Sequence, residues 1–600
     1  MQKPLLTVEN TLWGLILVLA LGIRLLNLGA DPLSESEAGW ALQALSLFPG
    51  SSHIETIPPG PQPLYIAVTG FLFGVMGDSD ALARALPALA GGLLCLAPYF
   101  FRKRVGNTAA LIMGVGLALD PGLVTVSRLA GGPMLALSFL LLGLGMLVSG
   151  RDILAGCLFG LAILSGPAAW HGALILALTA IAVRLFERLG LIGGRNDAVD
   201  EVDSVFTSTA YSLKALLAAF VATVLLVGTF FSFFPQGLGA LGGSIPAYLA
   251  GWVTASDVSA IQLLLVFLVY QPLAFIFGSL GAVRSWVEGN LAAQRLSVWV
   301  LIALIVGLLY PSRQVGDLVW VLVPLWGLAS IELARYFKIS SQHRTLVFVQ
   351  AVIVFLMLGL FWLNIAGISQ SLVNDQAYLL RIGVLLGVLA LIGLTTILLG
   401  FGWSWSAATQ GLVLGSVAAL GIYQIAGLWN SSQNTSTQLF TIWNPSPQTG
   451  ENRILIKTVQ DFSNWSTGTK DSIDLVVAVN SPSLRWTFRH YPNASFISEQ
   501  QPMTLMGSPG IVITRVSEQT PVLSASYRGQ DLAWWRYRGW EGALPQGLLS
   551  WIAYRKNPAS LEQVILWARA DLFPNGSIPS TDQLDSSIAP GIPLEADTPE

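Results

Sequence analysis

Residues 63–77 read PLYIAVTGFLFGVMG, and the way this stretch sits in the membrane decides the topology of everything that follows it. The stretch is apolar, but its 15 residues are short for a helix that crosses roughly 30 Å of hydrocarbon, and a proline opens it. The chain around it has 600 residues, of which 53% are hydrophobic and only 11% are charged. A soluble domain carries about 25% charged residues. The sequence therefore predicts a polytopic α-helical membrane protein.

Other apolar stretches have the length of membrane spans. Thirteen of them are long and apolar enough to cross the hydrocarbon. Counting residues 63–77 as a further span would invert every later loop, so the two topologies must be distinguished by another criterion. The thirteen predicted spans are residues 11–29, 82–101, 107–126, 131–149, 153–170, 172–189, 214–234, 260–281, 296–312, 316–333, 346–369, 381–402 and 408–429.

The distribution of basic residues favours one topology, because cytoplasmic loops of membrane proteins are enriched in Lys and Arg. If the N-terminus is cytoplasmic and residues 63–77 lie on the membrane, 14 of the 19 basic residues in residues 1–429 fall on the cytoplasmic side. Counting residues 63–77 as a span nearly reverses this ratio. We therefore expect an interfacial or re-entrant helix there, two long outer loops at residues 30–82 and 234–259, and an extracytoplasmic C-terminal part. The five outward basic residues are then Arg24, Arg84, Arg128, Arg313 and Arg381.

Charge density also predicts the domain organisation. Residues 1–429 hold 38 charged residues, whereas the much shorter remainder holds 27, which is closer to the globular range. We expect a transmembrane domain over residues 1–429 and a soluble extracytoplasmic α/β domain over residues 430–574, where β-branched runs such as ILIKTV (454–459) alternate with helical stretches. Residues 575–600, with few apolar side chains, are predicted to be disordered.

One motif of the soluble part combines aromatic and basic residues. WWRYRGW (534–540) partly alternates, so a strand there could place aromatic side chains on one face and basic ones on the other. Such a surface could stack on a sugar ring or lie on lipid headgroups. The alternative is a half-buried strand that packs within the protein. The residues concerned are Trp534, Trp535, Arg536, Tyr537, Arg538 and Trp540.

The first outer loop carries a cluster of carboxylates. Asp31, Glu35 and Glu37 lie within seven residues of one another in GADPLSESEAGWALQAL (29–45). Carboxylates beside a membrane are costly unless they are used or well solvated, so Glu37 and Glu35 are candidate catalytic residues. If a helix begins after Ser34 as its N-cap, however, both glutamates fall in its first turn, where acidic side chains stabilise the helix dipole. Both interpretations stay open.

Three outward arginines are candidate ligands for a phosphate or pyrophosphate group. Arg24 lies in the last turns of the first predicted span, Arg128 just after the third, and Arg313 between the ninth and tenth. A guanidinium presents a planar fork of donors and keeps its charge, which suits phosphate. The alternative for each is that it extends to lipid headgroups, and for His171 that it is a packed interfacial residue. The candidate substrate-binding residues are Asp31, Tyr65 and His171.

Four stretches in residues 10–150 carry a family resemblance: IRLLNLG (23–29), SEAGWALQA (36–44), the run 63–91 that begins PLYIAVTG, and the run 109–142 that begins AALIMGVG. In these stretches, with a weaker echo in WVLVP (320–324), the chain resembles the integral-membrane GT-C glycosyltransferases. The resemblance is to bacterial relatives of the protein O-mannosyltransferases and of the lipid A aminoarabinose transferases. It implies a GT-C fold and an enzyme of a bacterial cell membrane that transfers a sugar at the outer face. The donor would be a polyprenyl-phosphate-linked sugar, and the acceptor hydroxyl, on a lipid, glycan or protein, would attack with inversion.

Two motifs depart from the family pattern. Ser36 stands where the family has the aspartate of its Asp-Glu-Ala motif. Gly131 and Pro133 stand where the family has the second arginine and the aspartate of Ser-Arg-x-x-Arg-x-Asp. The resemblance then implies that Glu37 or Glu35 takes the proton of the acceptor, while Arg128 or Arg313, with Arg24, stabilises the departing phosphate. The alternative is a non-catalytic relative that binds polyprenyl-linked glycans or assists their export.

The sequence also excludes some partners and functions. No cluster of His, Asp or Glu has metal-ligand spacing, so no obligatory metal or cofactor is expected beyond the lipid-linked donor. The net charge of −3 argues against a nucleic-acid partner and leaves membrane lipids, the donor and the acceptor. A transporter is disfavoured because the spans hold few charges and show no evident internal repeat.

Overall fold

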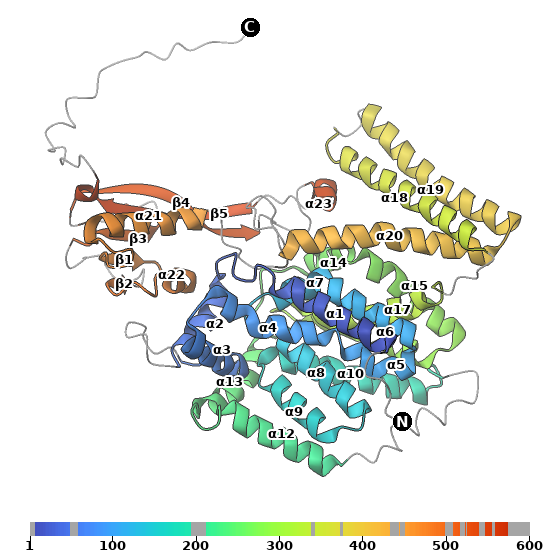
Figure 1. Cartoon of the computed structure of the whole chain (residues 1–600), viewed down its shortest axis with the longest axis horizontal. Helices are drawn as coiled ribbons and strands as arrows, with labels where there is room; N and C mark the ends of the chain where they lie inside the picture. Colours follow the sequence, from blue (N-terminus) through green and yellow to red (C-terminus); the bar gives the residue numbers. More distant parts are fainter. Residues whose placement is uncertain are drawn as a thin grey trace, which may run out of the picture. The chain divides into compact units, whose positions relative to one another are not determined.

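The computed structural model describes most of the chain, which forms two compact units. The first unit comprises Met1–Pro447 and Tyr537–Ser560, and the second comprises Gln448–Arg536 and Leu561–Glu600. Figure 1 shows the elements of both units in chain order. The described residues are 7–47, 58–193, 212–337, 343–371, 376–432, 443, 451–497, 508–516, 523, 525–538, 547–554 and 559–573.

Helices build the first unit. Their bounds are α1 (Val8–Leu25), α2 (Glu35–Leu45), α3 (Pro63–Met76), α4 (Asp80–Leu94), α5 (Ala97–Val105), α6 (Asn107–Leu119), α7 (Pro121–Ser127), α8 (Met134–Val148), α9 (Asp152–Ile163), α10 (Pro167–Arg188), α12 (Leu213–Gly228), α13 (Gln236–Ala250), α14 (Ala260–Tyr270), α15 (Pro272–Glu288), α16 (Leu291–Leu309), the 3₁₀ turn η1 (Val315–Leu318), α17 (Val319–Ala334), α18 (Arg344–Ile368), α19 (Gln376–Gly402), α20 (Trp405–Ser432) and α23 (Leu548–Tyr554).

The protein is a multi-pass membrane protein. Within the described residues, eight helices are long and apolar enough to cross a membrane, or up to ten if each of two bent helix pairs is one span. Three of the other predicted spans correspond to shorter apolar helices, α8, α9 and α12. The total of thirteen spans therefore stays a prediction. Residues 63–77 form the separate helix α3 of 14 residues, which contacts α2, and its interfacial position also stays a prediction.

Two predicted spans are broken rather than continuous. The span at residues 107–126 bends by 56° between α6 and α7, and the span at residues 260–281 bends by 94° between α14 and α15. At each break a proline, Pro121 or Pro272, begins the new helix. Proline has no N–H to donate to the preceding turn and suits the first position of a helix, which explains why both helices restart there.

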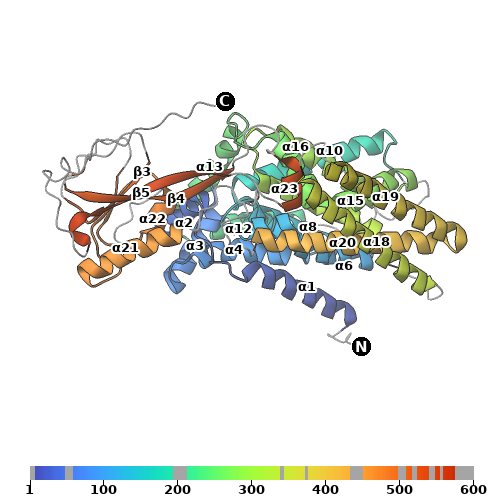
Figure 2. The same ribbon diagram turned by 90° about the horizontal axis from the view of Figure 1, so that it is seen from above.

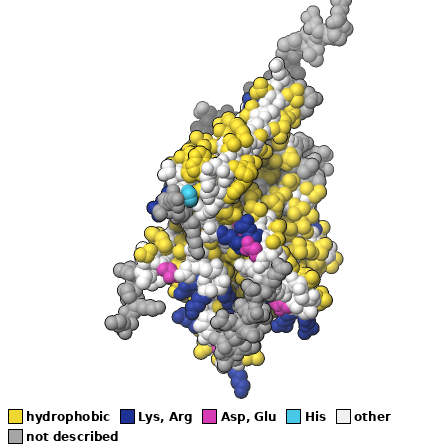
Figure 3. Space-filling view, turned by 90° about the vertical axis from the view of Figure 1, so that its right-hand side faces the viewer, with side chains coloured by type: hydrophobic (Ala, Val, Ile, Leu, Met, Phe, Trp, Pro, Cys, Tyr) yellow, Lys and Arg dark blue, Asp and Glu magenta, His cyan; other side chains and the backbone are white. Residues whose placement is uncertain are grey.

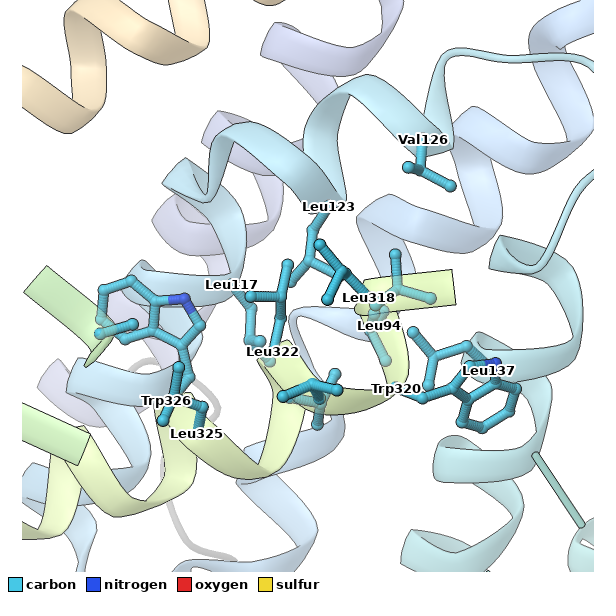
Figure 4. Close-up of a cluster of buried hydrophobic side chains, with 14 of the residues drawn as sticks. Leu94, Leu117, Leu123, Val126, Leu137, Leu318, Trp320, Leu322, Leu325 and Trp326 are labelled. Carbon is cyan, nitrogen blue, oxygen red and sulfur yellow. The ribbon is translucent and has the colours of Figure 1, made fainter. Parts of the chain in front are cut away.

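The core of the first unit surrounds α17. Figure 4 shows Trp320, Leu322, Leu325 and Trp326 of this helix among leucines from the neighbouring helices. Close packing depends on glycine at two positions: a Cβ built on Gly116 would lie 2.3 Å from the Trp326 ring, and one built on Gly172 would lie 2.1 Å from the Trp320 ring. Trp443, which is 1% exposed, packs in the same core beside Gly122.

The helices α18, α19 and α20 expose apolar side chains. They contact one another, and α18 and α20 lie side by side in both Figure 1 and Figure 2. Figure 3, which views the molecule from the right of Figure 1, shows hydrophobic side chains over wide areas of that face and basic side chains in a few groups. Exposed residues such as Leu356, Leu363, Leu386 and Leu398 give these helices the surface expected of helices in contact with lipid.

The second unit contains a five-stranded sheet with the order β2-β1-β3-β5-β4. Sheet and helices together agree with the predicted α/β class. Strand β1 pairs in parallel with β2 and β3, in the registers Leu475↔Ala494 and Leu475↔Ile511. Strand β5 pairs antiparallel with β3, and α21 runs alongside the sheet (Figure 1). The bounds are α21 (Glu451–Thr467), β1 (Leu475–Ala478), α22 (Pro482–Thr487), β2 (Ala494–Phe496), β3 (Ile511–Arg515), β4 (Tyr527–Arg538) and β5 (Ala559–Arg569).

Residues 454–459 were predicted as a strand, and this prediction is wrong. They lie in α21, where Leu455, Val459 and Phe462 are buried. Their spacing of four and three residues places them on one helical face. The apolar residues of this segment therefore follow the helical period over a longer window than the short β-branched run.

The motif of residues 534–540 lies in β4 up to Arg538. Its two tryptophans, Trp534 and Trp535, are adjacent in the strand, so they point to opposite faces, and both are buried. Trp534 Nε1 donates to Ser483 Oγ at 2.9 Å within the second unit. The alternative of a packed strand fits these contacts. Outside the described residues lie Trp540 and the tail 575–600.

Candidate functional site

Helix α2 in the first predicted outer loop begins as its sequence indicates. Ser34 is the N-cap with extended backbone angles, and Glu35 and Glu37 fall in the first turn. The Glu37 carboxylate reaches back and accepts from the Ser34 backbone N–H at 3.0 Å and from the Ser34 hydroxyl at 3.0 Å. This contact satisfies one of the amides that a helix start leaves without an intrahelical partner.

Glu37 also forms a buried ion pair with Arg84, which we call the outer ion pair. Arg84 Nε donates to Oε1 at 2.7 Å and Nη2 donates to Oε2 at 2.8 Å. The two side chains are only 2% and 5% exposed. Oε1 also accepts from the Ala130 N–H at 2.9 Å. Bidentate guanidinium–carboxylate pairs of this kind are among the strongest hydrogen-bonded contacts in proteins.

The contacts of Glu37 weaken it as a base. Burial alone would raise the pKa of Glu37, but the charge of Arg84 and the hydrogen bonds from Arg84, Ser34 and Ala130 outweigh burial and hold that pKa below its ordinary value. The carboxylate is therefore ionised at neutral pH, and donors of the protein itself already contact both of its oxygens. An acceptor hydroxyl could replace one of them only if this arrangement opened.

Arg84, one of the five basic residues with a predicted outward position, is buried in contacts with the protein itself. Besides Glu37, its guanidinium donates to the backbone carbonyls of Leu28 at 3.2 Å, Asp31 at 2.7 Å and Pro32 at 3.1 Å. Arg84 therefore ties α4 to the chain between α1 and α2. The sequence held one signal for this role: a lone arginine inside an otherwise apolar helix needs a partner.

Arg128, a predicted phosphate ligand, caps the C-terminal end of α1. Its Nη1 donates to the carbonyls of Ile23, Arg24 and Leu26 at 3.2, 2.9 and 2.6 Å, and its Nη2 donates to the carbonyl of Asn27 at 3.1 Å. Burial and the nearby charge of Arg84 lower the pKa of Arg128 to about 10, so it remains charged at neutral pH. A cation at this end of a helix is stabilised by the helix dipole.

Arg24, another predicted phosphate ligand, lies inside the protein. It is completely buried, and it donates to the carbonyls of Leu117 at 3.1 Å and Ala118 at 3.3 Å at the C-terminal end of α6. Among the three candidate arginines, Arg24 and Arg128 thus already donate to backbone carbonyls, although Arg24 Nε has no partner among the described residues. Neither presents a guanidinium fork to a phosphate in this structure.

Other predicted residues lie near the outer ion pair. Tyr65 of α3 is fully buried and its hydroxyl donates to the Ala83 carbonyl at 2.8 Å, so it packs α3 against α4. Asp31 is exposed, and Glu35 is half-buried at the start of α2. The structure therefore brings Asp31, Glu35 and Tyr65 into the region of Glu37, but the carboxylates on its surface are Asp31 and Glu35.

His171 lies in a different cluster. Because α9 ends at Ile163 and Gly166 has a φ of +92°, the helix break falls before Pro167, and His171 lies in the second turn of α10. The side chain is 3% exposed. Within the described part of the chain, neither of its ring nitrogens has a hydrogen-bond partner.

Tyr248 and Tyr310 pack against His171, and Trp252 packs against both tyrosines. We call these four residues the aromatic cluster: His171, Tyr248, Trp252 and Tyr310. The Tyr310 ring centroid lies 5.2 Å from that of His171 and is stacked on Tyr248 at 5.6 Å. The Trp252 ring meets Tyr310 edge-on at 5.2 Å.

Sequence reasoning found one residue of the aromatic cluster and missed the others. His171 lies on α10, Tyr248 on α13 and Tyr310 directly after α16, so no local spacing links them. The available signal was that Tyr248 and Trp252 fall in the predicted second outer loop and Tyr310 at the end of a predicted span. Buried polar groups usually have partners, but among the described residues the Tyr248 hydroxyl and the His171 ring nitrogens have none.

Arg313, the third predicted phosphate ligand, lies close to the aromatic cluster in the sequence. It follows Tyr310 by three residues, and its Nη1 donates to the Val258 carbonyl at 3.1 Å. The side chain is half-buried, and its Nε is buried without a partner among the described residues. The described residues contain no group of three His, Cys, Asp or Glu that could hold a metal ion.

Comparisons with known proteins identify the fold. No family model and no curated protein matches the sequence. The crystal structure of ArnT from Cupriavidus metallidurans bound to undecaprenyl phosphate matches 94% of this chain and 99% of its own, with a TM-score of 0.50 and 16% sequence identity. The chain has a GT-C fold.

Two further solved structures are similar at lower scores. The apo state of the same ArnT has a TM-score of 0.47 and covers 82% of this chain. The oligosaccharyltransferase from Archaeoglobus fulgidus, in complex with zinc and sulfate, has a TM-score of 0.41 and 13% identity; the match covers 81% of this chain and 62% of that one. The predicted GT-C architecture, a helical membrane domain followed by a sheet-containing domain, is confirmed by the ArnT match that covers nearly the whole chain.

The two departures from the GT-C sequence pattern can be placed in this fold. Ser36 is exposed on the first turn of α2, so the position of the usual aspartate presents a hydroxyl there. Pro133 is the residue before α8 and follows two glycines with φ of +75° and +76°. Neither position supplies a carboxylate, so the acidic groups available near α2 are those of Asp31, Glu35 and Glu37.

Proposed function

We propose that the protein is a membrane glycosyltransferase that moves a sugar from a polyprenyl-phosphate-linked donor to an acceptor hydroxyl at the outer face, with inversion at the anomeric carbon. The observation that carries the proposal is the set of buried polar atoms at His171, Tyr248 and Arg313 that have no partner among the described residues, in a chain with the GT-C fold. The ArnT structure of that fold has undecaprenyl phosphate bound, which supports a polyprenyl phosphate as one partner of this chain.

The aromatic cluster and Arg313 suit the two ends of such a donor. A sugar ring has apolar faces that stack on aromatic rings and hydroxyls that pair with the ring nitrogens of His171 and the hydroxyl of Tyr248. The neighbouring Arg313 would bind the phosphate. As the bond between the sugar and the phosphate breaks, negative charge grows on the phosphate, and a fixed guanidinium in a water-poor site stabilises it without reorganisation.

Glu35 is the carboxylate that we propose as the base. Its neighbour Glu37 is already contacted by Arg84, Ser34 and Ala130 and instead positions α2. Glu35 would accept the proton of the acceptor hydroxyl while the hydroxyl oxygen bonds to the anomeric carbon. The bond from that carbon to the phosphate oxygen breaks, and polyprenyl phosphate leaves with the electron pair. General-base catalysis of this kind contributes roughly 10²–10⁴-fold.

The residues near the start of α2 also favour a second, non-catalytic function. With Ser36 in place of the usual aspartate and Glu37 engaged by the outer ion pair, the chain would also suit a non-catalytic relative that binds polyprenyl-linked glycans or assists their export. This function would use the same aromatic cluster and Arg313, but it would need no base. The two functions therefore differ in turnover and agree in binding.

A transfer assay distinguishes these functions. The purified chain in lipid nanodiscs would receive a panel of undecaprenyl-phosphate-linked hexoses and pentoses together with a bacterial lipid extract as acceptor, and released undecaprenyl phosphate would be measured by mass spectrometry. We expect turnover in the wild type, a loss of roughly 10²–10⁴-fold in Glu35→Gln, and unchanged turnover in the control Glu562→Gln, whose carboxylate lies on the second unit. Donor binding without turnover would overturn the proposal that the protein is an enzyme and would support the function of a binding protein. Full activity of Glu35→Gln would overturn the proposal that Glu35 is the base.

A further inference from the structure

The two helix breaks of the membrane unit are joined by a side-chain hydrogen bond. Asp120 is the residue between α6 and α7, and Gln271 is the residue between α14 and α15. Gln271 Nε2 donates to Asp120 Oδ1 at 3.0 Å, and both side chains are completely buried. Two bends that lie 151 residues apart in the sequence therefore share one contact.

Asp120 makes further contacts that fix the direction of α7. Its Oδ1 accepts from the Leu123 N–H at 2.9 Å, at the N-terminal end of that helix, and its Oδ2 accepts from Trp326 Nε1 at 2.8 Å. A carboxylate at a helix N-terminus satisfies free amides and is stabilised by the helix dipole. At the other side of the break, Arg24 donates to carbonyls at the end of α6.

Helix α20 holds a carbonyl at each break with two consecutive side chains. Tyr423 donates its hydroxyl to the Val269 carbonyl at 2.7 Å, close to the end of α14. Gln424 Nε2 donates to the Leu119 carbonyl at 3.4 Å, at the end of α6. Inside a membrane domain a broken helix is tolerated only where neighbouring groups satisfy the carbonyls that the break leaves free. Neighbouring residues of one helix do this for both breaks.

The short helices α7 and α14, one beside each break, connect to the two clusters of the candidate site, which are the outer ion pair and the aromatic cluster. Helix α7 ends just before Arg128, and Ala130 then donates to Glu37 of the outer ion pair. The residue Val258, two positions before α14, accepts from Arg313 beside the aromatic cluster. Any change of bend at the breaks thus moves a backbone segment that contacts each cluster.

We propose that Asp120, Gln271, Tyr423 and Gln424 form a break junction that makes α7 and α14 move as one body and so sets the spacing between the outer ion pair and the aromatic cluster. These four are positioning residues that lie inside the membrane unit and touch neither cluster directly. The junction also has unused hydrogen-bonding capacity: among the described residues, Arg24 Nε, Gln271 Oε1 and Gln424 Oε1 are buried without partners. Unpaired buried polar atoms are costly, so a different bend that gives these atoms partners would offset the free energy of the hydrogen bonds that it breaks.

Hydrogen–deuterium exchange of the full chain in detergent tests the junction without reference to sugar transfer. Gln271→Leu removes the bond between the breaks, and we expect amide exchange to rise on the order of tenfold in peptides that cover residues 121–133 and residues 256–270 together. The matched control is Gln350→Leu. Gln350 is another completely buried glutamine of the same unit, bonded to Thr396 at 3.0 Å away from both breaks, so its loss should leave these two segments unchanged.

A milder variant keeps the test decisive if Gln271→Leu fails to fold. Tyr423→Phe deletes one hydroxyl and keeps the ring, and the junction predicts faster exchange in both segments although the deleted bond reaches only α14. Faster exchange confined to residues 256–270 would show that the breaks open independently and would overturn the proposal. Equal increases in the Gln350→Leu control would overturn it as well, because they would indicate general loosening.

Discussion

Replacing Glu37 by glutamine should destabilise the membrane unit strongly, because the substitution leaves Arg84 charged in a buried place. The Arg84 side chain is 5% exposed, and Glu37 is the carboxylate that it contacts at 2.7 Å. Removing one member of a buried ion pair costs about 3–5 kcal/mol, since the remaining charge loses its partner but stays desolvated. Part of the hydrogen bonding from Ser34 and Ala130 is lost with the carboxylate, at about 1 kcal/mol for each bond. We expect the melting temperature to fall on the order of 5–10 °C.

Thermal unfolding of the purified chain in detergent, followed by intrinsic tryptophan fluorescence, measures this effect. The matched control is Glu187→Gln, because Glu187 also pairs with an arginine, Arg295, but both side chains are about one-third exposed, at 33% and 31%. An exposed pair contributes roughly 0–1 kcal/mol, so this control should shift the melting temperature little. The double variant Glu37→Leu with Arg84→Met removes both charges and should recover much of the stability lost in Glu37→Gln.

The outcome that contradicts this reasoning is easily recognised. If Glu37→Gln melts within a degree or two of Glu187→Gln, the outer ion pair does not carry a buried charge. If the double variant is less stable than Glu37→Gln, the cost comes from lost packing and hydrogen bonds rather than from an unpaired guanidinium.

Three further outcomes follow from the same contacts. The pKa of Glu37 is lower in the folded protein than in the unfolded chain, so its contribution to stability is complete above the unfolded-state pKa and is lost as the pH falls through the folded-state pKa. Melting temperatures measured at decreasing pH should show this loss in the wild type and not in Glu37→Gln. Gly172→Ala should cost on the order of 1–3 kcal/mol, because the added Cβ would lie 2.1 Å from the Trp320 ring, and it would lower the melting temperature, whereas Gly239→Ala, which meets open space, should not. Treatment with a metal chelator should leave sugar transfer in the nanodisc assay unchanged, since the described residues contain no group of acidic, His or Cys side chains that could hold a metal ion, and a loss reversed by added divalent cation would contradict this.

Hydropathy predicted the class of this protein and could not predict where its helices break. An average over an 18-residue window treats α6 with α7, or α14 with α15, as one apolar run, because Asp120 and Gln271 are single polar residues in apolar surroundings. The local signal was the proline that follows each of them, which ends one helix and begins the next. In α21 the opposite occurred: a β-branched run matched a strand, and only the longer helical period of its buried residues revealed the helix.

The candidate site was predictable in its residue types and much less in their roles. Glu37 stood out as a carboxylate beside the membrane, but its role depends on Arg84, which lies 47 residues later and has no spacing that links it to Glu37. Guanidinium groups suit phosphate, but they also suit backbone carbonyls at helix ends, and in the fold Arg24 and Arg128 donate to such carbonyls. Their role as phosphate ligands stays a prediction. The contacts with these carbonyls arise from packing of distant segments, which a single sequence does not encode in a local pattern.

The burial of Trp443 beside Gly122 has a consequence for the order in which the protein is made. A side chain on Gly122 would overlap the Trp443 ring, and nearby Thr125 is bonded to Ser431, which follows it in the chain by 306 residues. While the ribosome is still synthesising the intervening helices, α7 lacks these late partners, and the space beside Gly122 stays open. The first half of the membrane domain thus enters the bilayer incomplete, and its interior closes only when one of the last segments of the unit has emerged.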